Sequence, residues 1–341
     1  MSGIVLVTGA GGFLGSHVVR KLVAEGRRVR AFVRRSTNVE GISDLPVEWA
    51  YGDVTDREAV AAAVAGCESL FHCVVNTQAW LRDPAPMHRV NVEGLRNVMD
   101  AALAEGIKRF IFTSTIATIG INGTGVSTEE DRFNYGRTAG NYIRCRVEAE
   151  ELFFGYVREH GLPGIAMNVA NTYGPGDYAL TPHGRLLSAA AFGELPVAID
   201  AGLACVGVED AAEAMLLAEK KGRIGERYIV SERWLTQQQL YEMAADQAGR
   251  KVRFRKMPIW MLYALGFGAD VVSKLRGRDS QLSVESARLS HILPDMDASK
   301  ARRELGWSPR PVEESVRAAV DFYKTRRGYA HPPPKGEGDR A

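Results

Sequence analysis

The sequence predicts an α/β protein with a doubly wound parallel sheet and a second, smaller mixed α/β domain. Two observations predict the sheet. Short apolar runs typical of buried strands alternate with helix-like segments through the first half of the chain. A glycine-rich segment directly follows the first apolar run and opens the first helix. After Tyr173 the strand and helix signals become shorter and mixed, which predicts the second domain.

Apolar runs and helical periodicity define the elements of the first half in order. The expected strands are Ile4–Thr8, Arg28–Val33, Val47–Tyr51, Ser69–Val74, Arg109–Ser114 and Gly164–Ala170, and the expected helices are Gly12–Glu25, Asp56–Ala65, Pro86–Glu105 and Asn141–His160. Since strands and helices alternate, the sheet is expected to be parallel. A ligand should then lie beyond the carboxyl ends of the strands, where the strand order reverses.

Three glycines at three-residue spacing lie between the first strand and the first helix. Gly9 permits a tight turn, Gly12 lets the backbone approach a pyrophosphate, and Gly15 lets the helix pack closely on the strand. The unpaired amides at the helix start, at Phe13 and Leu14, and the positive end of the helix dipole favour phosphates. This order of strand, glycines and helix is typical of a Rossmann-type dinucleotide-binding domain; a glycine-rich turn without a ligand is the alternative.

Length and composition exclude several classes of protein. The 341 residues include 43 Lys and Arg and 41 Asp and Glu, a net charge of +2, which gives no electrostatic case for a nucleic-acid partner. The four cysteines are scattered and fit neither a zinc site nor a disulfide framework, so no metal is expected. The first strand begins almost at once, so no signal peptide is expected, and no apolar run reaches the ~18 residues of a membrane span. A cytoplasmic protein is expected.

The change of pattern after Tyr173 predicts how the chain divides into two domains. Residues 1–172, with about 201–224, are predicted to form the dinucleotide-binding domain. Residues 173–200 and 225–326 are predicted to form the substrate-binding domain, with a strand at Glu226–Val230 and helices at Thr236–Ala248 and Val312–Thr325. Residues 327–341, rich in proline and charge, are expected to be a disordered tail.

Taken together, the motifs resemble the extended short-chain dehydrogenase/reductases over roughly residues 3–326. Within that superfamily the chain looks closest to the group of dihydroflavonol reductases, 3-beta-hydroxysteroid dehydrogenases and hopanoid-associated epimerase-like proteins. The motifs that carry the resemblance are the glycine segment from Thr8 to Gly15, Gly52-Asp53, Phe71-His72, Asn91-Val-Glu-Gly94, Phe112-Thr-Ser-Thr115, Tyr142, Tyr173-Gly-Pro-Gly176 and Asp297–Trp307 with Lys300, Leu305 and Gly306.

The resemblance implies a nicotinamide cofactor and several residues that bind it. Asp53 would reach the adenine, with Val54 as a backbone contact, and Thr55 is the better candidate to cap the following helix. Cys73 and Val74 would pass the cofactor ribose, and Asn171 would line the nicotinamide end. His72 also fits the family pattern, but a histidine in an apolar strand is more often structural than catalytic.

The end of the second strand predicts which cofactor is used. An acidic residue there would bind the ribose of NAD, and none is present. Arg34, with Arg35, Ser36 and Thr37 nearby, offers a cationic group for a 2′-phosphate. NADP(H) is therefore favoured over NAD(H), with an ordinary surface arginine as the alternative interpretation.

The resemblance also implies the catalytic residues. Thr115 would bind the substrate oxygen, with Ser114 in reserve, and Tyr142 would give or take its proton. The family pattern Tyr-x-x-x-Lys becomes Tyr-x-x-x-Arg here, so Arg146 takes the place of the lysine that binds the nicotinamide ribose and lowers the pKa of the tyrosine. A second departure is Val169, which follows Asn168 where the family usually has proline.

The substrate is less specified than the cofactor. Asn76 and Trp80, followed by Leu81 and Arg82, lie in the loop after the fourth strand, near the expected substrate mouth. The segment Pro258–Val272 is unusually apolar. A buried helix or a lid over the substrate is favoured for it over the peripheral membrane contact associated with this region in the steroid dehydrogenase branch.

Three functions remain open. The favoured one is hydride transfer between NAD(P) and a carbonyl or secondary alcohol of an apolar, steroid-, flavonoid- or aromatic-like small molecule. The first alternative is a nucleotide-sugar epimerase or dehydratase, for which Arg185 and Arg223 are candidate diphosphate ligands. The second is a catalytically silent cofactor-binding protein, which the arginine at position 146 favours. By the resemblance, a homodimer through the helices at 86–105 and 141–160 is expected.

Overall fold

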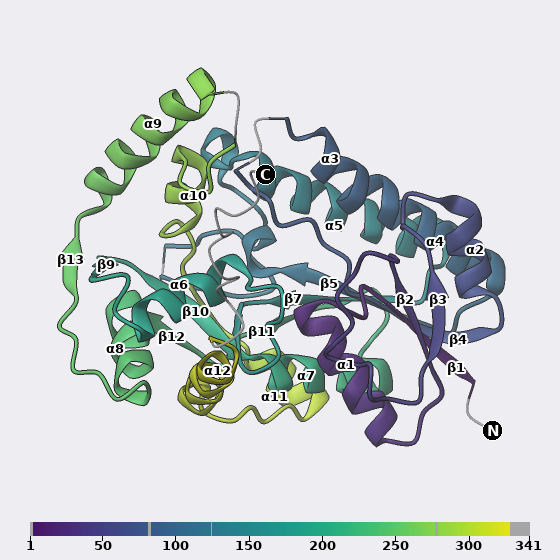
Figure 1. Cartoon of the computed structure of the whole chain (residues 1–341). Helices are drawn as coiled ribbons and strands as arrows, with labels where there is room; N and C mark the ends of the chain where they lie inside the picture. The colour runs from purple at the N-terminus through teal and green to yellow at the C-terminus, as the bar shows by residue number, and fades with distance from the viewer. Residues whose placement is uncertain (1–2, 81–82, 124, 277–278, 328–341) are drawn as a thin grey trace, which may run out of the picture.

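A seven-stranded sheet forms the centre of the molecule (Figure 1), and every neighbouring pair of its strands is parallel. The computed structural model describes residues 3–80, 83–123, 125–276 and 279–327. The strands are β1 (Ile4–Thr8), β2 (Val29–Val33), β3 (Glu48–Tyr51), β4 (Cys67–His72), β5 (Arg109–Thr115), β7 (Gly164–Val169) and β11 (Arg227–Val230). Their spatial order is β3-β2-β1-β4-β5-β7-β11, so the strand order reverses between β1 and β4.

Helices cover both faces of this sheet (Figure 1), which confirms the predicted doubly wound fold. On one face lie α1 (Phe13–Ala24), α7 (Val208–Lys221) and α11 (Ser299–Leu305), and on the other lie α2 (Arg57–Val64), α4 (Gly94–Glu105) and α5 (Asn141–His160). Side chains of a strand alternate between faces. In β1, Val5 and Val7 pack in the core beneath α1 and α7, whereas Leu6 packs beneath α2, α4 and α5.

The predicted helix at 86–105 is three pieces rather than one. Helix α3 (Ala85–His88) passes through a π-helical turn, η1 (Arg89–Glu93), into α4. The buried Asn91 lies in that turn, and its amide makes a hydrogen-bonded pair with the backbone of Asn76. A wider helical turn of this kind often occurs at functional sites, and here it anchors the loop that follows β4.

The second half forms smaller sheets and a separate apolar core. β8 (Asn171–Tyr173), β10 (Gly202–Gly207) and β12 (Arg233–Thr236) form a mixed three-stranded sheet. Two-stranded pairs join β9 (Val197–Ile199) to β13 (Arg255–Met257) and β6 (Val126–Ser127) to β14 (Asp295–Met296). The helices that share this core are α6 (Pro182–Ala191), α8 (Gln237–Gln247) and α12 (Val312–Arg326).

The strand predicted at 226–230 does not lie in the substrate-binding domain to which the sequence assigned it. The predicted strand at 226–230 exists as β11, but it pairs with β7 at the edge of the seven-stranded sheet and not within the smaller sheets. The division into two domains otherwise stays a prediction. Of the predicted tail, residues 328–341 lie outside the described residues, while Arg327 is the C-cap of α12 and bonds to Glu194.

The apolar segment after Pro258 forms α9 (Ile259–Arg276), which lies at the edge of the molecule beside α10 (Val284–Leu289) (Figure 1). The interpretation of this segment as a buried helix is wrong. Trp260, Phe267 and Leu275 are 70%, 65% and 81% exposed, because the helix packs along one side only. Among the described residues, no helix has both the length and the apolar character that a membrane crossing requires.

Candidate functional site

The strand register brings the predicted site residues to one edge of the sheet. Thr8, at the end of β1, lies beside Phe32 of β2 and His72 of β4, and His72 lies beside Phe112 of β5. The residues that follow these strands therefore emerge together at the carboxyl edge, next to the point where the strand order reverses. This is where a doubly wound sheet binds its ligand.

The glycine segment is pressed against the end of β4. Gly9 has φ +70°, and a Cβ on it would lie 2.9 Å from main-chain atoms of Cys73 and Val74. A Cβ on Gly15 would lie 2.2 Å from the main-chain oxygen of Gly9, so helix and turn touch through backbone atoms. Both glycines are therefore required by the packing.

Gly12 has a different role, because it leaves space. It is the N-cap of α1 and offers no side chain to the first-turn amides at Phe13 and Leu14. A Cβ on Gly12 would meet only the oxygen of Gly9 within 4 Å. The structure thus presents unpaired helix amides beneath open space, which fits the diphosphate of a dinucleotide.

Arg34 and Asp53 lie together where β2 and β3 end. The Arg34 Nη1 lies 4.0 Å from an Asp53 carboxylate oxygen, and the Arg34 side chain is 66% exposed. Asp53 is held by Thr55, whose backbone amide and hydroxyl both donate to its Oδ1, at 3.0 and 2.8 Å. Thr55 was the predicted cap of the next helix, but Asp56 caps it, by accepting from two first-turn amides. Asp53 is therefore left as an oriented acceptor at the sheet edge.

The residues after β4 are positioned from two sides. The hydroxyl of Thr113 donates to the Cys73 sulfur at 3.6 Å, and burial raises the pKa of the Cys73 thiol to about 12, so the thiol is neutral. Val74 packs into the apolar core beneath α4 and α5. Asn76 is fixed through its backbone by Asn91, at 2.7 and 3.0 Å.

The remaining residues singled out near the end of β4 are Trp80 and His72. Trp80 is half-buried in the same loop, and Leu81 and Arg82 lie outside the described residues. His72 is buried and bonded to the hydroxyl of Thr8 at 2.9 Å. Burial and the nearby Arg146 lower the pKa of His72 to about 3, so it is a neutral structural residue, as its place in an apolar strand indicated.

Thr115 is the last residue of β5 and begins the short helical turn η2 (Ile116–Thr118). Its hydroxyl oxygen accepts the backbone N–H of Ala117 at 3.2 Å. Since that oxygen is occupied as an acceptor, the hydroxyl proton is left to be donated elsewhere. Ser114, the reserve candidate, is buried and donates to Glu150, so its hydroxyl serves the core of the protein.

A buried polar network behind Thr115 escaped the sequence reasoning. Glu150, on α5 and 5% exposed, accepts from the Thr118 hydroxyl at 2.9 Å and the Asn168 amide at 2.7 Å. Its second oxygen pairs with Arg227 of β11 at 3.0 Å. Asn168 also donates to the Thr115 carbonyl at 3.1 Å. The network thus fixes the backbone that presents Thr115. In the sequence, the one indication of this network is Glu150 itself, a carboxylate eight residues after Tyr142 on the apolar side of the helix.

Tyr142 and Arg146 lie one helical turn apart on α5. Arg146 is 2% exposed, donates through Nη2 to the Thr113 carbonyl at 2.6 Å, and stacks on the Phe112 ring at 5.4 Å. Its Nε is buried without a partner among the described residues. Burial raises the pKa of Tyr142 above its usual value, and the Arg146 charge opposes that rise. Arg146 is therefore a fixed buried cation beside the tyrosine.

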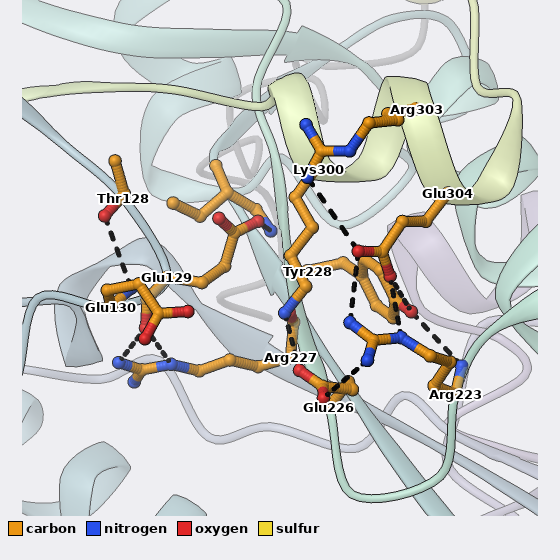
Figure 2. Close-up of polar contacts among 11 residues, drawn as sticks. Thr128, Glu129, Glu130, Arg223, Glu226, Arg227, Tyr228, Lys300, Arg303 and Glu304 are labelled. Carbon is orange, nitrogen blue, oxygen red and sulfur yellow. Dashed lines mark hydrogen bonds and ion pairs between the residues drawn. The ribbon is translucent and has the colours of Figure 1, made fainter.

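Two other expected ligands are engaged in structural contacts. The Asn171 amide donates to the Ala204 carbonyl at 2.9 Å and so ties β8 to β10. Arg223 precedes β11, at the amino edge of the sheet, and Figure 2 shows it bound to Glu304 and Glu226. Arg223 therefore lies at the opposite edge from the glycine segment, and its interpretation as a diphosphate ligand there is wrong.

Figure 2 also explains why the last motif of the resemblance is structural. Lys300 bonds to Glu226 at 2.7 Å and to the Arg227 carbonyl at 3.0 Å, and it lies over the Tyr228 ring. The Trp307 indole donates to the Asp210 carbonyl at 2.9 Å. These contacts fasten the C-terminal part of the chain to β11 and α7. Within the described residues, no group of three or more metal-ligating side chains is assembled.

Comparison with known proteins gives consistent matches. The model of the NAD dependent epimerase/dehydratase family matches residues 5–231. The chain is 31% identical to sterol demethylase protein B of Methylococcus capsulatus, over 94% of this chain and 98% of that protein. It is 29% identical to 2-alkyl-3-oxoalkanoate reductase of Stenotrophomonas maltophilia, over 92% and 97%. The crystal structure of gox2253 matches with a TM-score of 0.84 at 32% identity, over 95% of this chain and 98% of that one.

Proposed function

The chain belongs to the NAD dependent epimerase/dehydratase family, and we propose that it transfers hydride between NADP(H) and a carbonyl or secondary alcohol of an apolar substrate. The membership confirms the resemblance to the extended short-chain dehydrogenase/reductases and makes the chain an NAD(P)-dependent oxidoreductase. One observation carries the proposal. Tyr142 lies one helical turn before Arg146, a buried cation that forms no ion pair with a described residue. Arg146 donates to the carbonyl of Thr113 in β5, the strand that ends at Thr115.

The residues at the carboxyl edge would hold the cofactor. Gly9, Gly12 and Gly15 with the α1 amides suit the diphosphate, Asp53 the adenine, and Arg34 the 2′-phosphate. The bound nicotinamide would supply or accept the hydride. Cys73, Val74 and Asn171 remain predicted contacts near the ribose and the nicotinamide.

The chemistry of the chain itself is proton transfer and orientation. Tyr142 donates a proton to the substrate oxygen in reduction and removes it in oxidation. Arg146 favours the phenolate, because a nearby positive charge stabilises the charged form of a tyrosine. Thr115, whose oxygen already accepts a backbone amide, donates its own proton to the substrate oxygen and fixes its position.

Variants of two adjacent arginines, Arg34 and Arg35, test which cofactor the protein prefers. A charge-assisted hydrogen bond contributes roughly 1.5–3 kcal/mol, so Arg34→Ala should weaken NADP(H) binding about 10- to 150-fold and leave NAD(H) binding nearly unchanged. Arg35→Ala is the matched control, because the Arg35 guanidinium lies over the Tyr51 ring at 4.9 Å. Fluorescence titration of both cofactors measures the affinities. Equal affinities of the wild type for NADP(H) and NAD(H) would contradict the proposal.

An apolar substrate is favoured over a nucleotide sugar. One similar protein is named as a sterol demethylase protein and another as a reductase of 2-alkyl-3-oxoalkanoates. Arg223, a candidate ligand for a diphosphate, is bound to two glutamates at the far edge of the sheet. A panel of ketosteroids, flavonoids, aromatic aldehydes and nucleotide sugars, assayed with NADPH, tests this. Turnover of nucleotide sugars alone would establish the epimerase or dehydratase alternative. Cofactor binding without any turnover would establish the silent binder.

A further inference from the structure

A cavity of about 570 Å³ lies among the small sheets of the second half of the chain. Its walls come from β6 and β14, the start of β10, β12 and the first residue of α9. This volume is within the range of small-molecule sites, roughly 300–1,000 Å³. The side chains that give it a chemical character are Asp200, Trp234, Ile259, His291, Leu293 and Asp295.

An aromatic ring forms one flat wall of the cavity. The Trp234 indole lies across Gly202, where a Cβ would fall 1.8 Å from a ring carbon. Gly202 is therefore a glycine because the indole needs the space above its backbone. Trp234 is 39% exposed, so part of its surface remains open to a ligand. A rigid, half-exposed indole is a stacking surface for another ring.

The polar groups of the cavity are neutral or negative. His291 bonds to the Tyr263 hydroxyl at 3.0 Å, and burial holds the pKa of His291 below its usual value, so the ring is neutral near pH 7. Asp200 pairs with Lys256 at 3.0 Å, outside the lining residues. Asp295 forms no ion pair with a described residue, and neither Lys nor Arg lines the cavity. The charge of Asp200 is compensated by Lys256, so Asp295 is the carboxylate that disfavours an anion there.

One wall connects the cavity to the candidate active site. Leu293 lines the cavity and also packs in the apolar cluster that contains Ala117 and Tyr142. Ile259 and Ala201, which also line the cavity, pack with Tyr263 of α9 in a second apolar cluster. The cavity therefore lies between the cluster that contains Tyr142 and the first turns of α9.

We infer that this cavity binds the ring system of an uncharged substrate by stacking it on Trp234, and that Asp295 disfavours anionic molecules such as nucleotide diphosphates. His291, which the Tyr263 hydroxyl holds in place, would bind a hydroxyl or carbonyl group of the same molecule. The inference rests on the proposed function for its link to catalysis, but the binding itself requires neither cofactor nor turnover.

A pair of probes that differ in charge tests the binding. 2-Acetonaphthone is neutral, and 2-naphthoate has the same rings and a carboxylate. Isothermal titration without cofactor should give the ketone an affinity at least about tenfold higher than the carboxylate. Trp234→Ala should lower the ketone affinity about tenfold, and Trp234→Phe should largely keep it. Trp260→Ala is the control, because Trp260 is 70% exposed on α9 and does not line the cavity.

The carboxylate of Asp295 is tested with the same probes. Asp295→Asn should keep the ketone affinity and bring the naphthoate affinity to within about threefold of it. The inference is overturned by equal binding of the two probes to the wild type, or by equal effects of Trp234→Ala and Trp260→Ala. If Trp234→Ala does not fold, the asparagine variant decides alone, and unchanged discrimination in that variant overturns the inference.

Turnover separates this inference from the proposed function. If the probes bind as expected but no carbonyl on the panel is reduced, the proposed function fails and the binding site stands. If ketones are reduced with a KM that Trp234→Ala leaves unchanged, the proposed function stands and the inference fails.

Discussion

Replacing Arg146 by methionine should move the pH dependence of catalysis to higher pH. Methionine fills much of the same buried space without charge. Arg146 is one helical turn from Tyr142, where side chains lie about 5–6 Å apart at Cβ. A cation at such a distance lowers the pKa of an acid by about 1–3 units, so its removal should raise the pKa of Tyr142 by about as much. Burial already raises that pKa, and Arg146 is what opposes it.

The rate effect follows from the fraction of phenolate. Alcohol oxidation requires the phenolate, which becomes tenfold scarcer for each unit by which the pKa rises. At pH 8, kcat/KM for oxidation should therefore fall about 10- to 1,000-fold, and the rising limb of its pH profile should move up by the same 1–3 units. Arg146→Lys keeps a cation that can still donate to the Thr113 carbonyl, so its limb should stay within about one unit of the wild type.

High pH distinguishes a charge effect from a loss of shape. If Arg146 acts through its charge, the methionine variant recovers most of its activity on the plateau above the shifted limb. An ultraviolet difference titration, with Tyr142→Phe subtracted, reports the same pKa without catalysis. A limb that does not move, or a plateau that stays low while the protein remains folded, would refute the reasoning and make Arg146 a packing residue.

Two further predictions concern stability and cofactor binding. Glu150→Gln should lower the free energy of unfolding in urea by about 3 kcal/mol, because it breaks a buried ion pair with Arg227 while Arg227 keeps its bonds to the carbonyls of Glu129 and Asp131. The control is Glu148→Gln at an exposed position, which should change the free energy of unfolding by less than about 0.5 kcal/mol. Equal effects of the two variants would contradict the buried network. Gly15→Ala should cost about 1–3 kcal/mol and weaken NADPH binding at least about tenfold, because its Cβ meets backbone at 2.2 Å. Gly155→Ala, where nothing lies within 4 Å, should be neutral or stabilising, and NADPH affinity unaffected by Gly15→Ala would count against the glycine cradle.

The features predictable from the sequence were those that local physics determines. The glycine spacing predicted the β1–α1 turn because each glycine answers a separate steric requirement, and Gly9 and Gly15 meet backbone atoms as that reasoning demands. Helix α5 was predicted with its observed bounds, Asn141–His160, from its apolar stripe, and in the structure Gly161 ends it in the left-handed conformation. The prediction of Arg34 beside the sheet edge also needed only the end of one strand.

The features that were missed depend on contacts between distant segments. The Glu150 network joins β5, α5, β7 and β11, and no local pattern indicates that β11 pairs with β7. The cavity beside Trp234 is likewise assembled from five separate segments. Helix α9 was misjudged because apolar composition indicates burial, whereas this helix lies on the edge of the fold with Trp260 and Phe267 in the open.

The charges around Arg146 and Glu150 explain how the departure at position 146 is compatible with catalysis. Both Arg146 and Glu150 lie on the same side of α5, and a carboxylate one turn away would ordinarily cancel the cation beside Tyr142. Here the Glu150 charge is already taken up by Arg227 and by three neutral donors. His72, another titratable group close to Arg146, is neutral. Arg146 therefore keeps a full positive charge, held by a carbonyl and an aromatic ring rather than by an anion, and that charge is available to the phenolate that catalysis requires.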